Sequence, residues 1–266
     1  MSGELCGNIL VTGTSRGIGL ELVRQLAQQV EKEAHLYACC RDPEGSRSQA
    51  LRDLAAQYPD KISIIRLDTS DEDSISAAVK AVSEQIGDGG LNLLINNAAI
   101  NQPDSPAPLS ATEKKHMMDV FETNVVGPFL LAKMFLPLLQ RAAERDPPGN
   151  DKGDKMSCRR SAIINISTMI SSIEKCPENF SMAQMYPYRT SKAALNMLTR
   201  CQAEDFKADN ILVTAIHPGW VRTDMGGEMA PMTSQDSVLG MLRLLSSLSN
   251  KDCGKFLDWQ GESIPW

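Results

Sequence analysis

The sequence has few of the side chains that build metal sites and disulfide frameworks. Its 266 residues include three histidines and seven cysteines, an odd number, and no two cysteines form a Cys-x-x-Cys pair. No histidine lies at ligand spacing, so the pattern predicts neither a metal site nor a disulfide framework. We expect the cysteines to be reduced thiols that pack as small apolar side chains.

An excess of positive charge and a long apolar run are also missing. Lys and Arg total 27 against 33 Asp and Glu, a net charge of −6, whereas general nucleic-acid-binding proteins have the opposite balance. The most apolar stretch, Val125 to Leu139, is interrupted by Pro128, Lys133 and Pro137, so we predict no membrane span. Residues 1–5 lack the basic and apolar regions of a signal peptide, and Ser2 stands where myristoylation requires glycine. These absences predict a cytoplasmic protein with no nucleic-acid or membrane partner.

Short apolar runs alternate with helical patterns through most of the chain. Hydrophobic residues make up 42% and charged residues 23%, as in soluble globular proteins. Nearly continuous apolar runs suit parallel strands that are covered on both faces, and Ile18, Leu22 and Leu26 recur at helical spacing. We predict an α/β fold, a single Rossmann-type domain over residues 1–266 with a doubly wound parallel sheet of about seven strands and helices on both faces. The predicted strands are Asn8–Thr12, His35–Cys40, Ile62–Leu67, Leu91–Asn96, Ala162–Ser167, Ile211–His217 and Lys255–Asp258.

Two segments depart from this alternation. Residues 141–160 are charged and rich in Pro and Gly, which predicts a polar surface loop before the fifth strand. A solvated connection is favoured there over a partner-binding insertion. Residues 219–234 combine several methionines with the pair Gly226 and Gly227, which favours a substrate lid over an ordinary crossover loop.

A glycine-rich turn follows the first predicted strand. Gly13, Gly17 and Gly19 have the spacing G-x-x-x-G-x-G and lead into an amphipathic helix. Such a turn lets the backbone and a helix N-terminus approach a pyrophosphate. The sequence therefore predicts a dinucleotide site near its N-terminal end.

This motif and four later blocks resemble those of the short-chain dehydrogenase/reductase family. The later blocks occur in the family's order over nearly the whole chain and are Asn96-Asn97-Ala98-Ala99, Asn124, Tyr188 to Lys192, and His217-Pro218-Gly219. The runs 186–192, 217–227 and 256–261, with Pro265-Trp266, are similar to those of sniffer-type carbonyl reductases and C-factor-like proteins. The resemblance implies the Rossmann-type fold and an NAD(P)-dependent oxidoreductase.

The residues aligned with the family's adenosine site favour NADP(H) over NAD(H). An NAD enzyme has a carboxylate at the tip of the second strand, where this chain has Cys40. Arg41 and Arg16 can instead bind a 2′-phosphate, although Asp42 could pair with Arg41. Ala99 replaces a family glycine, which is tolerated if its φ is negative. The residues assigned to the cofactor by the motif and the resemblance are Gly13, Ser15, Arg16, Gly17, Ile18, Gly19, Arg41, Asp68, Thr69, Asn97, Ala98, Ala99, Tyr188, Lys192, Pro218, Gly219, Val221 and Thr223.

Tyr188 and Lys192 are the strongest catalytic signal. Their spacing of four residues puts both side chains on one face of a helix. A Lys ammonium and the positive nicotinamide of the oxidised cofactor both favour the phenolate, so we expect a lowered pKa for the phenol. The resemblance makes Tyr188 the acid that protonates a carbonyl oxygen, and gives Lys192 the nicotinamide ribose as a further ligand.

Two further catalytic residues come from the resemblance. Asn124 aligns with an Asn whose backbone helps to bind a water in the proton relay, although Asn is also a common start of a helix. Thr168 stands where relatives have the Ser that contacts the carbonyl oxygen, and its hydroxyl has the same donor and acceptor capacity. Ser167 is then structural or lines the cofactor, and Ser171 is a remote candidate.

These residues together predict an NADPH-dependent carbonyl reductase for aldehydes, ketones, quinones or α-dicarbonyls. Ile170, Met185 and Trp220 would make its substrate pocket apolar. The alternative is an NADP-binding regulatory or scaffold protein with little turnover, against which the intact pair Tyr188 and Lys192 argues. An epimerase or dehydratase of the extended short-chain group is disfavoured by chain length and glycine spacing. Helices that are apolar on more than one face must be covered by the sheet and by a second surface. The resemblance implies that this surface is the same helix pair of a second subunit, in a homodimer with a four-helix interface.

Overall fold

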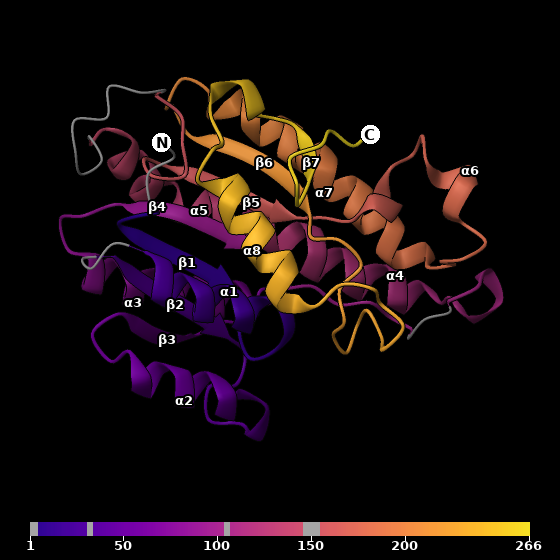
Figure 1. Cartoon of the computed structure of the whole chain (residues 1–266), viewed down its shortest axis with the longest axis horizontal. Helices are drawn as coiled ribbons and strands as arrows, with labels where there is room; N and C mark the ends of the chain where they lie inside the picture. The colour runs from indigo at the N-terminus through magenta and orange to yellow at the C-terminus, as the bar shows by residue number, and fades with distance from the viewer. Residues whose placement is uncertain (1–4, 31–33, 104–106, 146–154) are drawn as a thin grey trace.

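Seven strands form one parallel sheet in the computed structural model, which describes residues 5–30, 34–103, 107–145 and 155–266 (Figure 1). The spatial order is β3-β2-β1-β4-β5-β6-β7. The strands are β1 (Asn8–Thr12), β2 (His35–Cys40), β3 (Ile62–Arg66), β4 (Leu91–Asn96), β5 (Ala162–Ile166), β6 (Leu212–His217) and β7 (Phe256–Asp258). Each lies within one of the predicted runs, and the predicted doubly wound Rossmann-type sheet is confirmed.

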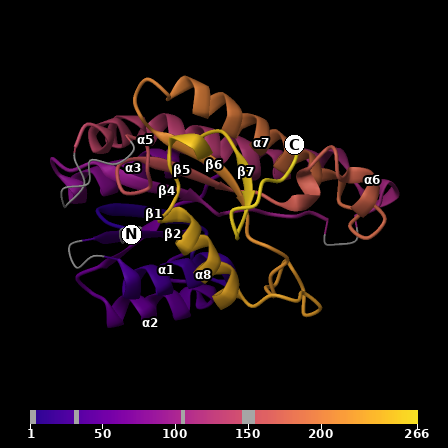
Figure 2. The same cartoon turned by 45° about the horizontal axis from the view of Figure 1, so that its top comes forward.

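Helices cover both faces of the sheet. Figure 2 shows α1, α2 and α8 on one side and α3, α5 and α7 on the other. Successive residues of β1 point to opposite sides, so that Ile9 and Val11 join the core under α1 and α8 while Leu10 joins the core under α3 and α5. The α-helices are α1 (Gly17–Gln29), α2 (Gln49–Gln57), α3 (Glu72–Ile86), α4 (Lys114–Phe121), α5 (Gly127–Ala143), α6 (Cys176–Asn179), α7 (Tyr186–Asp205) and α8 (Ser234–Leu245).

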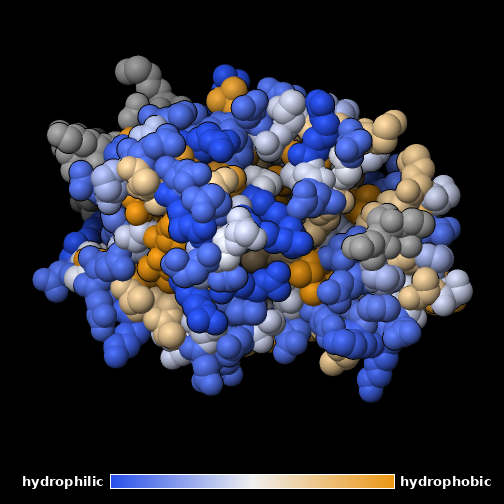
Figure 3. Space-filling view, turned by 90° about the horizontal axis from the view of Figure 1, so that it is seen from below, coloured by the Kyte–Doolittle hydropathy of each residue, from blue (hydrophilic) through white to orange (hydrophobic). Residues whose placement is uncertain are grey.

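One helical run is longer than the sequence indicated. A π-helical turn, Glu122–Val126, joins α4 to α5, so that the helix is continuous from Lys114 to Ala143. By length and composition alone this run could cross a membrane, and the expected interruptions do not break it. Half of its most apolar window is nevertheless buried inside the protein, where Leu131 and Phe135 pack in the core. That burial is typical of a core helix. The face of the molecule that Figure 3 shows is mainly hydrophilic, with small separate apolar patches.

The segment 141–160 is a loop over only part of its predicted length. α5 continues to Ala143, and Arg141 donates hydrogen bonds of 2.8 and 3.1 Å to the carbonyls of Gly87 and Gly89. Met156 and Cys158 are buried in the core beside α8. The prediction of a solvated loop therefore fails at both ends, because a helix and a buried apolar pair occupy them. Its centre, residues 146–154, lies outside the described residues.

The strand order places the ends of β1 and β4 side by side. Chain connections leave these two neighbours in opposite directions across the sheet, which is where doubly wound proteins bind their ligands. The carboxyl ends of β1, β4, β5 and β6 all open onto this edge of the sheet, since the strands are parallel. Many of the predicted site residues follow these ends, and Arg41, Asp68 and Thr69 follow the ends of β2 and β3.

Candidate active site

The turn after β1 forms a backbone cradle. Gly13 and Gly17 have φ of +71° and +56°, conformations that favour glycine. A Cβ on Gly19 would lie 2.1 Å from the carbonyl oxygen of Gly13, so no side chain fits there. Arg16 precedes the first turn of α1 and makes no side-chain cap, which leaves the first N–H groups of the helix open to an anion. The cradle fits a pyrophosphate.

The end of β4 holds this cradle in place. Thr12 Oγ1 accepts hydrogen bonds of 3.0 Å from the backbone N–H groups of both Asn97 and Ala98. In return, Asn97 Nδ2 donates to the carbonyls of Thr12 and Gly13 at 2.9 and 3.2 Å. Of the described residues other than glycine, only Asn210 has a positive φ, so Ala99 meets the condition for replacing glycine.

A single pocket brings most of the predicted residues together. It contains every predicted cofactor residue except Gly219 and Val221, which lie beside it in the segment after β6. Its lining also includes Ser167, for which a cofactor contact was one of the two expectations, and seven residues that were not assigned to the cofactor: Cys40, Leu67, Ile100, Thr123, Ile166, Asp224 and Met225. Most of these directly adjoin a predicted residue in the chain, so proximity in sequence was the available signal.

Two arginines that were assigned to the adenosine of the cofactor, Arg16 and Arg41, line the pocket. Arg41 follows Cys40 and is exposed. The Asp42 carboxylate accepts the Gly45 N–H at 3.1 Å, and the ion pairs of the described residues do not include Arg41. Burial raises the pKa of the Cys40 thiol, so no anion forms there. This part of the pocket is therefore suited to a phosphate.

Lys192 is anchored to the end of β5. The residue is 2% exposed, and its Nζ donates to the carbonyl of Ile166 at 2.7 Å. The same Nζ lies 5.8 Å from the ring centroid of Tyr188. Both side chains line the pocket, as the helical spacing of four residues predicted.

The pKa of Tyr188 moves in the opposite direction to the expectation. Burial raises the pKa of its phenol to about 12 and lowers the pKa of Lys192 to about 7. Both shifts arise because the charged forms lose hydration. In the protein alone, desolvation thus outweighs the attraction of an ammonium that is itself partly neutral at pH 7. The phenol is protonated at neutral pH, the form that a proton donor requires.

Asn124 does not begin a helix. It lies in the π-helical turn of the continuous run and is fully buried. Its amide accepts from the Ile100 N–H and donates to the Ile100 carbonyl, both at 2.9 Å, and it also donates to Ser191 Oγ at 3.1 Å. Asn124 therefore ties the loop after β4 to α7, and it is not among the pocket-lining residues.

The end of β5 separates the two candidate hydroxyls. Ser167 lines the pocket and is buried, and its hydroxyl donates to Asn196 Oδ1 at 2.6 Å. Thr168 is half-buried and immediately precedes a 3₁₀ turn, Met169–Ser171. Thr168 is not among the residues that line the pocket. Its Oγ1 makes no hydrogen bond to the described residues, so this hydroxyl is free to donate to a ligand.

The predicted lid connects β6 to α8. Trp220 and Met229 are exposed, Val221 pairs with Met232, and the Thr223 methyl would lie 3.4 Å from a Cβ on Gly17. An ion pair of 2.9 Å joins Asp224 of this segment to Arg16 of the glycine turn. The segment thus contacts the glycine turn at the N-terminus of α1.

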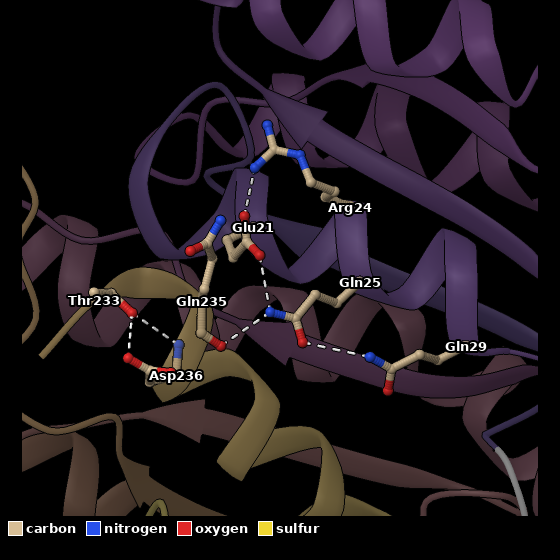
Figure 4. A network of polar contacts seen from close by, with 7 residues as sticks. All are labelled: Glu21, Arg24, Gln25, Gln29, Thr233, Gln235 and Asp236. Atoms are coloured by element: carbon tan, nitrogen blue, oxygen red, sulfur yellow. Dashed lines mark hydrogen bonds and ion pairs between the residues drawn. The ribbon is translucent and has the colours of Figure 1, made fainter.

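A polar network, buried at Glu21 and Gln25, anchors the far end of the segment after β6 (Figure 4). Gln25 Nε2 in α1 donates to Glu21 Oε1 at 2.8 Å and to the Gln235 carbonyl at 3.0 Å. Thr233 caps α8 by accepting the Asp236 N–H at 3.0 Å. The helix that leaves the glycine turn therefore also fixes the start of α8. In the described part of the chain no cluster of three His, Cys, Asp or Glu could hold a metal ion.

Comparison with known proteins gives the family. The family model for short chain dehydrogenases matches residues 7–234. The chain belongs to the short-chain dehydrogenase family. The predicted resemblance and the prediction of an oxidoreductase are thereby confirmed.

Several solved structures and curated proteins are similar over most of the chain. The NADPH-bound carbonyl reductase from chicken fatty liver is 42% identical with a TM-score of 0.90, covering 98% of this chain and 100% of that one. The carbonyl reductase Sniffer of D. melanogaster is 35% identical with a TM-score of 0.86 at the same coverage. C-signal of Myxococcus xanthus is 30% identical over 188 residues, which are 71% of this chain and 100% of that protein.

Proposed function

We propose that this short-chain dehydrogenase is an NADPH-dependent carbonyl reductase that reduces aldehydes, ketones, quinones or α-dicarbonyls. The observation that carries the proposal is the pair of half-buried Tyr188 and buried Lys192 in the pocket that also contains the glycine cradle. A proton donor and a dinucleotide cradle in one pocket are what a carbonyl reduction requires.

The cofactor of this oxidoreductase is NADP(H). The chicken carbonyl reductase, similar over 98% of the chain, is described as NADPH-bound. In this chain Arg41 and Arg16 line the adenosine end of the pocket, and no carboxylate occupies the position of Cys40. Two guanidinium groups bind the dianionic 2′-phosphate better than the neutral 2′-hydroxyl of NADH. The lining residues assigned above are proposed to hold it.

The chain's own residues would act on the carbonyl oxygen. Bound NADPH supplies the hydride. Tyr188, with its pKa raised to about 12, holds the proton that the oxygen takes as its charge develops. Thr168 Oγ1 donates a hydrogen bond to the same oxygen, and Lys192 holds the ribose end of the nicotinamide while remaining bonded to Ile166.

The proposed substrates are apolar carbonyl compounds. Trp220 and Met225 of the proposed lid are exposed large apolar side chains. Met185 immediately precedes α7, and Ile170 lies in the 3₁₀ turn after β5. Flexible methionines adapt to varied apolar shapes. A lid with this composition favours hydrophobic ketones, quinones and α-dicarbonyls over small polar substrates.

A second copy of the chain is the proposed partner. Large apolar side chains are exposed on three neighbouring helices: Met118 and Phe121 on α4, Phe129 on α5 and Met197 on α7. α4 packs against α7, so the patch is shared between helices. An apolar patch on helices that already cover the sheet is suited to a symmetric interface. Light scattering near 29 kDa at micromolar concentration would reject the homodimer.

The cytoplasm is the proposed location. Six cysteines are free thiols, and Cys201 is exposed; the six are Cys39, Cys40, Cys158, Cys176, Cys201 and Cys253. Unpaired thiols persist in a reducing compartment. Fractionation that places the protein in an oxidising compartment would overturn this assignment.

The activity is tested by mixing the purified protein with NADPH and a panel of quinones, aldehydes and α-dicarbonyls, and following the loss of nicotinamide absorbance. Tyr188→Phe removes the proton and keeps the ring, so we expect turnover to fall by about 10² to 10⁴ while NADPH still binds. NADPH binding without turnover of any substrate would instead indicate the regulatory or scaffold role.

A further inference from the structure

One buried side chain in α7 connects the catalytic helix to the strand end that carries Thr168. Asn196 follows Lys192 by one helical turn and Tyr188 by two, so all three share one face of α7. It is 3% exposed. Where Lys192 binds the Ile166 carbonyl, Asn196 Oδ1 accepts the hydroxyl of the next residue, Ser167, at 2.6 Å.

The nitrogen of the same amide is connected to the Thr168 carbonyl through Ser171. Asn196 Nδ2 donates to Ser171 Oγ at 2.9 Å. Ser171 in turn donates its hydroxyl to the Thr168 carbonyl at 2.6 Å, and its backbone N–H donates to that carbonyl at 3.0 Å. The amide therefore binds the residue before Thr168 directly and the Thr168 carbonyl through one serine.

Proton counting fixes the direction of each bond. A serine hydroxyl has one proton. The Ser167 hydroxyl donates its hydrogen bond to Asn196 Oδ1, and the Ser171 hydroxyl donates its hydrogen bond to the Thr168 carbonyl. Ser171 Oγ therefore acts as the acceptor for Asn196 Nδ2. The 3.3 Å contact between the two serine oxygens then has no proton to share. Ser167 consequently has no proton left for a substrate, which leaves Thr168 as the hydroxyl that can donate.

We propose that Asn196 is a positioning residue that sets the Thr168 hydroxyl relative to the Tyr188 phenol. The two groups must reach the same carbonyl oxygen, but one lies on a strand end and the other on a helix. Asn196 belongs to the helix and holds the strand end on both sides of Thr168. This inference rests on the proposed carbonyl reductase activity, in which Thr168 contacts the substrate.

A double-mutant cycle tests the proposal with the full-length protein. Asn196→Ala, Thr168→Ala and the double variant are compared for kcat, KM and NADPH affinity, with active protein counted by NADPH binding. We expect Asn196→Ala to lower kcat about tenfold with little change in NADPH affinity, since a small misplacement of a reacting group is costly. In the Thr168→Ala background the same change should lower kcat less than twofold, because its target is gone.

Thr199→Val is the matched control. Thr199 lies on α7 close to Asn196 and is buried. It accepts a hydrogen bond of 2.9 Å from Asn165 of β5 and donates to the Leu195 carbonyl, and its hydroxyl is not hydrogen-bonded to Ser167 or Ser171. Thr199→Val removes a buried hydrogen bond between β5 and α7 and leaves the contacts of Asn196 with Ser167 and Ser171 in place. We expect its kcat to stay within twofold of the wild type. If Asn196→Ala folds poorly, Ser171→Ala removes the link to the Thr168 carbonyl at a smaller loss of packing, with the same coupling expected.

Two results would overturn the inference: an unchanged kcat in Asn196→Ala, or an equal fall in both backgrounds. A second measurement needs no turnover and so separates this inference from the proposed function. In protein with ¹³C-labelled threonine methyl groups, Asn196→Ala should shift or broaden the Thr168 signal, and Thr199→Val should leave it in place. An unmoved Thr168 signal rejects the positioning role even if no substrate is found.

Discussion

The catalytic groups and the lid are held in place by opposite kinds of contact. Lys192 and Asn196 are 2% and 3% exposed, and each is hydrogen-bonded to the end of β5. The contact between lid and glycine turn is instead the ion pair of Arg16 and Asp224, whose side chains are 51% and 74% exposed. The contacts of Lys192 and Asn196 are buried from water, whereas the ion pair of Arg16 and Asp224 is exposed to it.

This difference determines what a ligand can change at each place. Leaving a buried polar group without a partner costs about 1–3 kcal/mol, so the arrangement around Thr168 resists rearrangement. An exposed ion pair contributes about 0–1 kcal/mol and is screened by salt, so a phosphate can replace the Asp224 carboxylate at little cost. We therefore expect the proposed catalytic geometry to change little when a ligand binds, and the contact between Arg16 and Asp224 to be exchangeable.

The largest expected effect concerns the buried ammonium. The pKa of Lys192 is lowered to about 7 in the folded protein from 10.5 in the unfolded chain. Between these values the unfolded chain binds a proton that the folded protein lacks, so the Lys192 contribution to the free energy of unfolding rises with pH by about 1.4 kcal/mol per unit. Below pH 7 both states are charged and the full penalty remains.

Lys192→Met removes this penalty, so its stability relative to the wild type should depend on pH. Measured by denaturant unfolding without NADPH, any advantage of the variant at pH 6 should shrink by about 2–3 kcal/mol at pH 9. A difference that does not change with pH would mean that Lys192 is hydrated in the folded protein. The conclusion that Lys192 is buried from water would then be wrong.

The second prediction concerns the Thr168 hydroxyl, which makes no hydrogen bond to the described residues. Thr168→Ala should lower kcat by about 10², as expected when one donor to a developing oxyanion is lost. Thr168→Ser keeps the donor and should retain most activity. Ser167→Ala leaves Asn196 Oδ1 without its donor, so we expect a loss of about 1–3 kcal/mol in stability with a smaller loss in kcat. An inactive Ser167→Ala beside an active Thr168→Ala would reverse the assignment.

The contrast also explains how much the sequence could predict. The parallel strands and the glycine turn were predictable because both depend on local patterns, namely continuous apolar runs and glycines at fixed spacing. The Tyr188 and Lys192 pair was predictable for the same reason. Asn124 was misplaced because its conformation is set by a π-helical turn inside a long helix, and nothing in its neighbours marks that turn.

Other features depend on contacts that are distant in sequence. Asn196 binds Ser167 and Ser171, which lie 29 and 25 residues away, so its role could not be read from α7 alone. The available signal was its place four residues after Lys192 on the catalytic face. The raised pKa of Tyr188 was missed because it follows from burial, which a motif does not give. Met156 and Cys158 likewise belong to a core that the surrounding polar residues concealed.

The third prediction concerns the exposed guanidinium at the adenosine end. We expect NADPH to bind at least about tenfold more tightly than NADH, which corresponds to roughly 1.4 kcal/mol. Arg41→Asp should erode this preference mainly by weakening NADPH. Arg47→Asp makes the same charge change on an exposed turn nearby that does not line the pocket, and it should have a smaller effect. Equal affinities of the wild type for both cofactors would reject the assignment.

The smallest expected effect tests whether the lid contact is exchangeable. Asp224→Asn removes the carboxylate that pairs with Arg16 at 2.9 Å, so the guanidinium is free for the 2′-phosphate. Because exposed pairs contribute less than about 1 kcal/mol, we expect NADPH to bind about two- to fivefold more tightly, with NADH unchanged. Fluorescence titration measures both affinities, and the gain should decrease as salt is raised.

Glu228→Gln provides the control for net charge in this comparison. Glu228 is exposed on the same lid segment, and among the described residues it has no ion-pair partner. If both variants tighten NADPH equally, the effect comes from net charge and the pairing with Arg16 is irrelevant. If Asp224→Asn weakens NADPH instead, the pair supports the bound state, and the lid contact is part of the site that Arg16 forms for the cofactor.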